Sequence, residues 1–364
     1  MVQTFLGFWE RLSKPIMALS PMDGVTDFAY RYITALHGKP DVVFTEFTTV
    51  EGLFHAPERI LQDFEYSEIE RPIVAQIYGA TPDDFYKATH VVCELGFDGV
   101  DINMGCPSKA VVKRNCGAKL ITVPDLALEI IRAVRQGIQD WAGGQTLEKL
   151  ALSQNLCEVV GRMNLKRTGI ANPVLKKIIP WSVKTRIGYD SVVIENWVET
   201  LLTEQPALIS IHGRTLKQMY SGAADWDAIA RAAKIIHQTP TLVMGNGDLQ
   251  TLEEGRRAIE NSGVDGVLIG RSAIGNPWVF KNKMPFDIGR EVRIKTALEH
   301  AIYFKQSRGD KGFRHLNKHL IAYLRHFSDA SLLRAAAVRV KNFEELQHIL
   351  SCTGPSYENK ITPS

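Results

Sequence analysis

The sequence predicts an α/β fold, a (β/α)8 TIM barrel followed by a small all-helical domain. Eight short apolar runs rich in β-branched residues lie between residues 16 and 269, and segments with helical periodicity separate most of them. Each run is as long as a buried parallel strand and shows little polar alternation. After residue 285 these runs stop and helical patterns continue. We therefore expect a barrel domain at 1–285, with an insertion at about 139–179, and a helical domain at 286–364.

The expected elements alternate in the order that such a barrel requires. Strands are expected at 16–19, 42–45, 73–77, 99–102, 182–185, 208–211, 241–244 and 266–269. Helices are expected at 82–95, 124–138, 193–203, 226–237 and 252–262. Asp225 precedes one helix, and Thr251 opens another with Glu254 three residues later, which is the spacing of a capping box. A doubly wound open sheet is the alternative, and it is weaker because no GxGxxG follows the first strand.

Composition excludes several classes of protein. The 364 residues are 45% hydrophobic and 23% charged, with a formal net charge of +3, which is typical of globular domains and compatible with a polyanionic partner. The five cysteines are scattered without a CxxC pair, which argues against structural zinc and against a disulfide framework. We find no signal peptide and no apolar run of transmembrane length. We expect a monomeric cytoplasmic protein with no metal and no membrane contact.

The segment DINMGCP at 101–107 carries the strongest single signal in the chain. Cys106 follows an apolar strand, and catalytic groups of barrels lie at the carboxyl ends of their strands. Gly105 permits a tight bend, and Pro107 fixes φ and removes a backbone donor. The alternative is a small buried packing residue, because free cysteines are among the most buried residue types.

The other expected strands also end in polar or conformationally special residues. They are Pro21, Met22, Asp23, Glu46, Gln76, Asn103, Lys184, Arg186, His212, Arg214, Asn246, Gly247, Asp248, Gly270 and Arg271. Because the carboxyl ends of barrel strands converge, this set predicts an active site. Lys184 is compatible with a Schiff base, with a cation that stabilises a reduced cofactor, or with an ion-pair partner. His212 is compatible with a general acid, a phosphate ligand or a core histidine.

Two glycine turns indicate a phosphate-bearing cofactor. The segments at 245–248 (GNGD) and 269–271 (IGR) follow the seventh and eighth strands, where barrels usually bind phosphate. Such turns direct backbone N–H groups toward an anion, and Arg271 adds a positive fork. Taken alone, each turn is equally compatible with a plain loop. Gln76 and Asn103 carry neutral amides, which suit hydrogen bonding to the edge of a flavin or pyrimidine ring.

Two segments fall outside the barrel pattern. The insertion carries more lysine and arginine than acids, and we expect an inserted helix pair on the side or bottom of the barrel, either as a tolerated surface feature or as a partner contact. The tail has one acid, Asp329, between residues 313 and 341. Its basic residues are Arg314, His315, Lys318, His319, Arg325, His326, Arg334, Arg339 and Lys341. They form either a solvated helix face or a surface that contacts nucleic-acid phosphates.

The motifs taken together resemble those of the tRNA-dihydrouridine synthases, flavin enzymes that reduce uridine in tRNA. The matching segments are LSPMDGVTD (19–27), FTEF (44–47), AQIYG (75–79), DINMGCPSKAVVKRNCGAKL (101–120), VKTRIG (183–188), IHGRTLKQMYSGAADW (211–226), GNGD (245–248) and DGVLIGRSAIGNPW (265–278). They cover nearly all of the barrel. The tail segments HLIAYLRHF (319–327) and RVKNFEEL (339–346) resemble the tRNA-binding domain of this family.

The resemblance implies roles for individual residues. FMN would be held by Pro21, Met22, Asp23, Gln76, Lys184, His212, Asn246, Gly247, Asp248, Gly270 and Arg271. NADPH or NADH would be the reductant. Cys106 would protonate C5 of a D-loop uridine on the face opposite to the hydride that reaches C6. The nucleotide would be gripped by Asn103, Arg186, Arg214 and Tyr220. The insertion departs from the usual pattern of the family, and Cys116 is expected to be a packing residue.

Three other functions remain as alternatives at this stage. A dihydroorotate-type dehydrogenase would also use an FMN barrel, but the basic tail has no evident use with a small substrate. A Schiff-base aldolase or lyase built on Lys184 would lack the flavin absorbance band. A non-catalytic RNA-binding module would not need the polar strand ends. The sequence determines neither the D-loop uridine that is modified nor the choice between NADPH and NADH.

Overall fold

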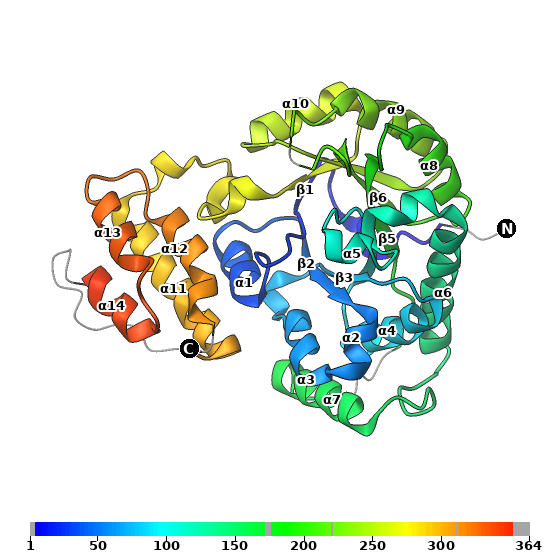
Figure 1. Ribbon diagram of the computed structural model, residues 1–364, viewed down its shortest axis with the longest axis horizontal. Helices are drawn as coiled ribbons and strands as arrows, with labels where there is room; N and C mark the ends of the chain where they lie inside the picture. Colours follow the sequence, from blue (N-terminus) through cyan, green and yellow to red (C-terminus); the bar gives the residue numbers. More distant parts are fainter. Residues whose placement is uncertain (1–3, 172–175, 220, 311, 352–364) are drawn as a thin grey trace. The chain divides into compact units, whose positions relative to one another are not determined.

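The computed structural model describes residues 4–171, 176–219, 221–310 and 312–351 (Figure 1). The chain divides into two compact units. The barrel unit comprises Met1–Asp27 and Pro40–Gly270, and the helical unit comprises Phe28–Lys39 and Arg271–Ser364. No helix in the described ranges combines the length and the apolar character that crossing a bilayer requires.

The barrel unit is a closed parallel sheet of eight strands in chain order, so the predicted fold class is confirmed. The strands are β1 (Ile16–Leu19), β2 (Val42–Thr49), β3 (Ile73–Tyr78), β4 (Gly99–Met104), β5 (Trp181–Gly188), β6 (Leu208–Thr215), β7 (Leu242–Asn246) and β8 (Gly266–Ile269). The expected strands are all present. β2, β5 and β6 run three to four residues beyond their expected ends, because ladder pairing continues through polar residues after the apolar run stops.

Helices on the outside of the sheet connect successive strands (Figure 1). They are α2 (Val50–His55), α3 (Pro57–Ile60), α4 (Pro82–Glu94), α5 (Lys109–Val112), α6 (Pro124–Ala142), α7 (Gln154–Thr168), α8 (Ile194–Leu202), α9 (Trp226–Ile236) and α10 (Leu252–Ser262). Asp225 and Thr251 cap α9 and α10 by accepting hydrogen bonds from Ala228 N and Glu254 N. The carboxylate of Glu254 accepts from Gln250 N rather than from the cap residue itself.

An apolar plug closes the amino end of the barrel. Phe8 and Trp9 of the 3-10 helix η1 (Gly7–Arg11) pack against residues at the starts of the strands, among them Ile16, Val42 and Leu242. The strand residues of this cluster point into the barrel, and on β1 they are Ile16 and Ala18. They are two residues apart because alternate side chains of a strand point to the same face. The interior of the barrel is therefore apolar at its amino end.

The described part of the insertion contains one helix, α7, so the expectation of a helix pair is wrong. The first residues of the insertion continue α6 to Ala142 instead. Helix α7 lies beside α3 on the outside of the barrel unit (Figure 1). Its cations pair with acids between α3 and the 3-10 helix η3 (Glu68–Glu70), in the pairs Arg162–Glu58, Lys166–Glu65 and Arg167–Glu68. Ser153 caps its start, and Gly169 ends it in the left-handed conformation.

The helical unit includes a helix from the N-terminal part of the chain. It contains α1 (Phe28–His37), α11 (Arg290–Arg308), α12 (Asn317–Tyr323), α13 (Ala330–Ala337) and α14 (Phe343–Ser351). Ala29 and Ile33 of α1 share one apolar cluster with Ala297 and Ala301 of α11. The C-terminal segment of the unit therefore starts at residue 271 rather than at the expected 286, and α1 contributes to its apolar core.

The basic tail is not one continuous helix. Helix α12 ends at Tyr323, so Arg325 and His326 lie in the following turn. His319 is buried beside the rings of Tyr30 and His300. Burial lowers its pKa well below the usual value, so it is uncharged at neutral pH. His319 therefore contributes nothing to a basic surface, contrary to the expectation.

The closing ladder between β1 and β8 depends on Gly266. A Cβ atom at this position would lie 2.3 Å from Ile16 O, a backbone atom of the partner strand. We expect Gly266→Ala to lower the free energy of unfolding of the barrel unit by about 1–3 kcal/mol, because the overlap forces the two strands apart. Urea unfolding followed by circular dichroism measures this change.

The matched control is Gly161→Ala within α7. A Cβ there meets nothing nearer than 3.9 Å, and alanine is the better helix former. This control should unfold at an unchanged or slightly higher urea concentration. Equal urea midpoints for Gly266→Ala and the unmodified protein would show that β1 and β8 can accommodate the added methyl group without loss of stability.

Candidate active site at the carboxyl ends of the strands

Strand register brings six of the predicted polar residues into three adjacent rows, together with three polar residues that were not predicted. Side chains two positions apart on a strand point to the same face, and each row consists of Cα partners on neighbouring strands. The rows are Gln76, Asp101 and Ser182; then Asn103, Lys184 and Ser210; then Arg186, His212 and Asn246. The strand ends therefore converge as the sequence predicts.

Cys106 lies just past β4, in a loop that the side chain of Asn103 anchors. Asn103 Oδ1 accepts hydrogen bonds from Cys106 N at 2.9 Å and from Gly105 N at 3.1 Å. Ala118 N donates to Cys106 O at 3.2 Å. Gly117 has a φ of +62°, and a Cβ there would lie 2.8 Å from Cys106 O. Backbone contacts on both sides therefore fix the position of the thiol.

The Cys106 thiol is mostly withdrawn from solvent, with 8% of the residue exposed, and it packs with Val111 and Cys116. Burial raises its pKa above the ordinary value of 9.0, and the charge of Asp23 adds to this effect. A backbone hydrogen bond from Ser108 and the charges of Arg186 and Lys184 oppose the rise. At neutral pH the sulfur therefore carries its proton.

A chain of side-chain hydrogen bonds runs across the first two rows. Asp101 Oδ2 accepts from Gln76 Nε2 at 2.6 Å, and Gln76 Oε1 accepts from Asn103 Nδ2 at 2.8 Å. Asp101 Oδ1 accepts from the Ser182 hydroxyl at 2.5 Å. Asp101 is fully buried, and this burial raises its pKa to about 6. The chain joins a buried carboxylate to the loop that carries Cys106.

Lys184 occupies the centre of the second row. Its Nζ donates to Asn246 Oδ1 at 3.2 Å, and Asn246 Nδ2 donates to Leu268 O at 2.9 Å. Burial, helped by the neighbouring charge of Arg186 and opposed by that of Asp101, lowers the pKa of Lys184 to about 8. Asp101 is the carboxylate whose charge acts on this ammonium. The ammonium has donors left for a ligand.

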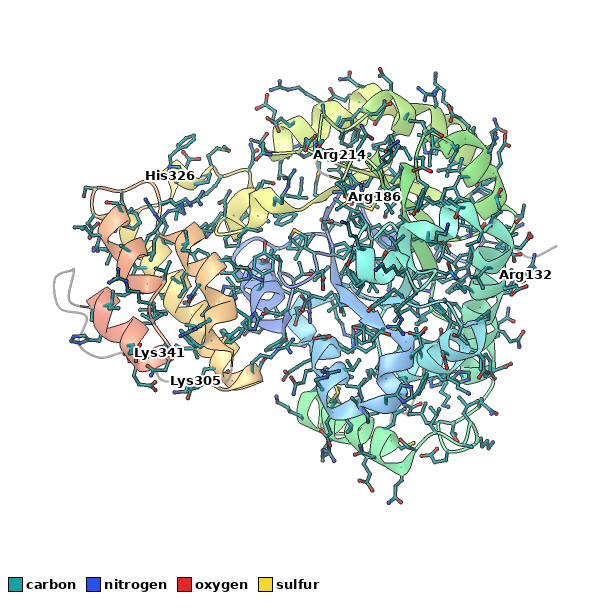
Figure 2. All side chains as sticks on the ribbon, in the orientation of Figure 1. Arg132, Arg186, Arg214, Lys305, His326 and Lys341 are labelled. Atoms are coloured by element: carbon teal, nitrogen blue, oxygen red, sulfur yellow. The ribbon has the colours of Figure 1, made fainter. Side chains whose placement is uncertain are left out.

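Arg186 and Arg214 are directed to groups of the protein itself. Arg186 Nε donates to Gly105 O at 2.7 Å, and its Nη1 donates to Thr215 O at 3.1 Å. Arg214 Nη2 donates to Gly222 O and to Asp248 Oδ2, both at 2.6 Å. Figure 2 shows both arginines within the barrel unit, whereas Arg132 lies at its outer edge. Each guanidinium therefore ties active-site loops together.

The turn after β7 has the backbone geometry expected of an anion site. Gly247 has a φ of +141° and Asp248 a φ of +56°. A Cβ on Gly247 would lie 2.5 Å from Ala224 Cβ, so this position requires glycine. Asp248 Oδ2 also accepts from Ala224 N at 2.8 Å. The Asp248 carboxylate thus organises the neighbouring loop, and the backbone of the turn is the part suited to an anion.

The remaining predicted residues lie on β2 and β6 and in the loops after β1 and β8. Pro21 and Met22 are half-buried and Asp23 is exposed, in a turn where Met22 N donates to Thr26 Oγ1 at 3.0 Å. Glu46 is buried on β2. His212 Nε2 lies 3.4 Å from Arg214 Nη1. Gly270 ends the barrel unit, and a Cβ there would make only ordinary contacts; Arg271 is exposed and opens the helical unit. Tyr220 lies outside the described residues.

Sequence reasoning did not assign a role to Asp101 or Ser182. Asp101 was part of the DINMGCP segment, two residues before Asn103, and so on the same face of its strand. A charged residue inside an otherwise apolar buried strand is uncommon. That anomaly was the available signal for Asp101. Ser182 gave no comparable signal, because its partner is on another strand.

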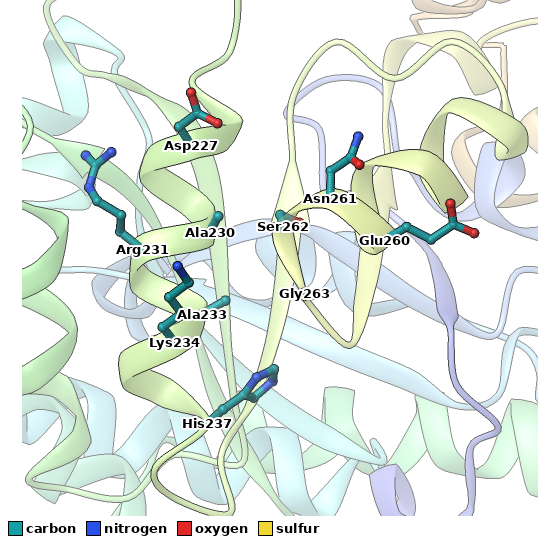
Figure 3. Close-up of a pocket in the computed structure, with 10 residues that line it drawn as sticks. All are labelled: Asp227, Ala230, Arg231, Ala233, Lys234, His237, Glu260, Asn261, Ser262 and Gly263. Atoms are coloured by element: carbon teal, nitrogen blue, oxygen red, sulfur yellow. The ribbon is translucent and has the colours of Figure 1, made fainter.

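A hollow on the outside of the barrel unit is separate from these strand ends. It measures about 490 Å³ and is lined by residues of α9, of α10 and of the turns that follow them, among them Lys234, His237 and Asn261 (Figure 3). Two of its charged side chains are already paired, Arg231 with Glu195 and His237 with Asp265. The described residues contain no group of three or more His, Cys, Asp or Glu side chains placed to hold a metal ion.

A parallel β/α barrel with a thiol, an amide chain and a cation at its strand ends defines an enzyme. The model of the dihydrouridine synthase (Dus) family matches residues 18–141 and 167–354. The chain belongs to the dihydrouridine synthase family, which makes it a flavin-dependent oxidoreductase. The match leaves out residues 142–166, which belong to the insertion and include most of helix α7.

Curated relatives resemble the chain along nearly its whole length. A probable tRNA-dihydrouridine synthase 2 of Bacillus subtilis (strain 168) is 32% identical over 349 residues, covering 94% of this chain and 95% of that protein. A probable tRNA-dihydrouridine synthase of Staphylococcus aureus (strain COL) is 31% identical over 350 residues, covering 94% of each.

Solved structures with related folds are more distant. A DHODH from Eimeria tenella in complex with ferulenol has a TM-score of 0.48 and 12% identity, covering 79% of this chain and 82% of that one. A morphinone reductase variant in complex with tetrahydroNAD has a TM-score of 0.45 and 10% identity, covering 76% and 88%. At these values the likeness carries no argument about function.

Proposed function

We propose that the protein reduces a D-loop uridine of tRNA to dihydrouridine, with FMN as resident cofactor, NADPH or NADH as reductant and Cys106 as the proton donor. The observation that carries the proposal is the thiol of Cys106. It is held by backbone contacts at a barrel strand end and kept protonated by burial. Reduction of the C5–C6 double bond requires a hydride at C6 and a proton at C5, and a neutral thiol supplies the proton.

The residues at the strand ends fit a flavin mononucleotide. The positive-φ turn at Gly247 and Asp248 offers backbone N–H groups to the phosphate. Lys184 has N–H donors beyond the one that Asn246 accepts. Ser210 Oγ, in the same row as Lys184, is buried without a hydrogen-bond partner among the described residues. When bound, FMN would supply hydride transfer to the pyrimidine.

The same residues would hold the cofactor in the roles expected from the sequence. Pro21, Met22 and Asp23 would border its ring, and Lys184 would place a positive charge at the ring edge that becomes electron-rich on reduction. Gln76 has one N–H left for the ring, because Asp101 and Asn103 already occupy its other Nε2 hydrogen and its Oε1. His212, Asn246, Gly270 and Arg271 would complete the phosphate end.

Cys106 would give its proton to C5 and become a thiolate for the rest of the turnover. The Ser108 backbone and the charges of Lys184 and Arg186 stabilise that thiolate, since each of them lowers the pKa of Cys106. Asn103 would meet the uracil edge, and Arg186 would keep the thiol loop in place through Gly105 O. The uridine would have to leave its stack to reach these strand ends.

The helical unit would supply the positive surface for the tRNA backbone. Its exposed cations include Arg314, Lys318, Arg325, Arg339 and Lys341, and phosphate contacts dominate affinity for nucleic acids. Arg334 is less suitable, because its Nη1 donates to Leu324 O at 2.7 Å and supports the turn after α12.

Removal of the thiol tests its assignment as acid. We expect Cys106→Ala to lower the rate of dihydrouridine formation by about 10²–10⁴-fold, the usual contribution of a general acid, while FMN content stays unchanged. Dihydrouridine is measured by mass spectrometry of digested tRNA. Cys116→Ala, a second thiol in the same cluster, is the matched control and should retain activity. Equal activity of both variants would remove Cys106 from the reaction.

The pH dependence of the rate tests the charge on Lys184. Its ammonium is lost as the pH rises through about 8, so the rate of the unmodified enzyme should decline there. Arginine stays protonated in this range, so Lys184→Arg should move the decline to higher pH. Lys184→Met should be slow at every pH and show no such decline. A high-pH limb that is the same in Lys184→Arg and the unmodified enzyme would contradict this role.

The tRNA surface is tested by salt dependence. Arg339→Gln combined with Lys341→Gln should weaken tRNA binding and lower the slope of log Kd against log salt by about 0.7 for each phosphate that the protein no longer neutralises. Lys234→Gln combined with Arg256→Gln removes the same charge from exposed positions of α9 and α10 and should leave the slope unchanged. Filter binding over a range of potassium chloride concentrations measures both slopes. A change confined to the second pair would move the docking surface to the barrel.

A further inference from the structure

We propose that Asp101 is a positioning residue whose carboxylate sets the direction of the hydrogen-bond chain that holds the Cys106 loop. The inference deepens the proposed function and rests on it. The hydrogen bonds of the Asp101 carboxylate go to Gln76 and Ser182 and not to the thiol. It acts on Cys106 through two intervening amides, Gln76 and Asn103.

The direction of the chain follows from the chemistry of its members. An ionised carboxylate only accepts hydrogen bonds, whereas a glutamine or asparagine amide can donate from one side and accept on the other. Asp101 Oδ2 therefore compels Gln76 to present its Nε2, and Gln76 must then turn its Oε1 toward Asn103. This leaves Asn103 to donate with Nδ2 and to face the loop with Oδ1.

Only this orientation of Asn103 holds the loop. Its Oδ1 accepts from both Gly105 N and Cys106 N. In the reversed orientation Nδ2 would face two backbone N–H groups, and all three groups would be donors. Without a fixed acceptor at Asp101, the two orientations of Gln76 compete, and the loop loses its anchor in one of them.

The surroundings of Asp101 support a carboxylate and not a neutral acid. Gln76 on β3 and Ser182 on β5 both donate to it, and Lys184 on β5 contributes a positive charge. The main chain of Gln76 is fixed in turn, because its N donates to Thr45 Oγ1 of β2 at 3.0 Å. Burial opposes these effects and raises the pKa of Asp101 to about 6. The chain therefore has its direction above this pH and loses it as the pH falls through it.

The test compares Asp101→Asn with Asp98→Asn in the FMN-loaded enzyme. Asp98 lies just before the other end of β4, pairs with Arg71 and accepts from Ile73 N, so its loss affects stability but not the chain. Three quantities are measured: kcat and KM for tRNA against pH, the alkylation rate of Cys106 by iodoacetamide from peptide mass spectrometry, and the thermal unfolding midpoint.

We expect Asp101→Asn to lower kcat by about tenfold or more, as for the loss of a hydrogen bond to a charged group, with KM for tRNA nearly unchanged. Cys106 should be alkylated several-fold faster, and the decline of kcat near pH 6 should disappear. Asp98→Asn should lower the unfolding midpoint and keep the kcat, the alkylation rate and the pH profile of the unmodified enzyme. Unchanged alkylation and kcat in Asp101→Asn, or the same changes in both variants, would overturn the proposal.

A second variant decides the matter where Asp101→Asn does not fold. The Ser182 hydroxyl lowers the pKa of Asp101, so Ser182→Ala should move the acid limb of kcat to higher pH, and an unmoved limb would overturn the proposal. The alkylation measurement does not depend on turnover. If no variant and no unmodified enzyme forms dihydrouridine, the proposed function fails, while the alkylation rates still report whether Asp101 positions the loop.

Discussion

The ladder between β1 and β8 is the constraint on which the active site depends. It turns a row of eight parallel strands into a closed ring, and in doing so it brings residues from distant parts of the sequence to one rim. Asn103 and Lys184 are 81 residues apart in sequence and direct Cα partners in the sheet. An open sheet of the same strands would leave β8 and β1 at opposite edges, and the loops that follow them would lie far apart.

Burial has one consistent effect on the titratable groups at this rim. It raises the pKa of Cys106 and of Asp101 and lowers that of Lys184, so each group is moved toward its neutral form. In a low-dielectric site the remaining charges act strongly on one another. Burial brings the pKa values of Lys184 and Asp101 toward the neutral range, whereas each of the two charges opposes burial by shifting the pKa of the other toward its charged form.

The sequence predicts the strands well and the loops less well, for a physical reason. A strand buried on both sides is a continuous apolar run. The predicted first and last residues of β1 and β8 therefore agree with the observed ones. The family resemblance, carried by motifs at the strand ends, is confirmed by the family match. By contrast, the partners of Arg186 and Arg214 are backbone carbonyls of other loops, and no local pattern encodes which carbonyl comes near. The sequence also did not predict that α1 belongs to the helical unit. The apolar side chains of α1 pack against residues that lie 260 or more positions later in the chain, and no local pattern indicates such a contact.

Arg186 illustrates how the loops and the chemistry are connected. A guanidinium offers five N–H donors in a fixed plane, and here it links Gly105 O of the thiol loop to Thr215 O at the end of β6. Asn103 holds the same loop from the other side by accepting from the loop's own N–H groups. The Gly105–Cys106 segment is thus held both through its backbone N–H groups, by Asn103, and through a backbone carbonyl, by Arg186. The thiol position is therefore determined by two independent networks, and displacement of the sulfur requires that both of them yield.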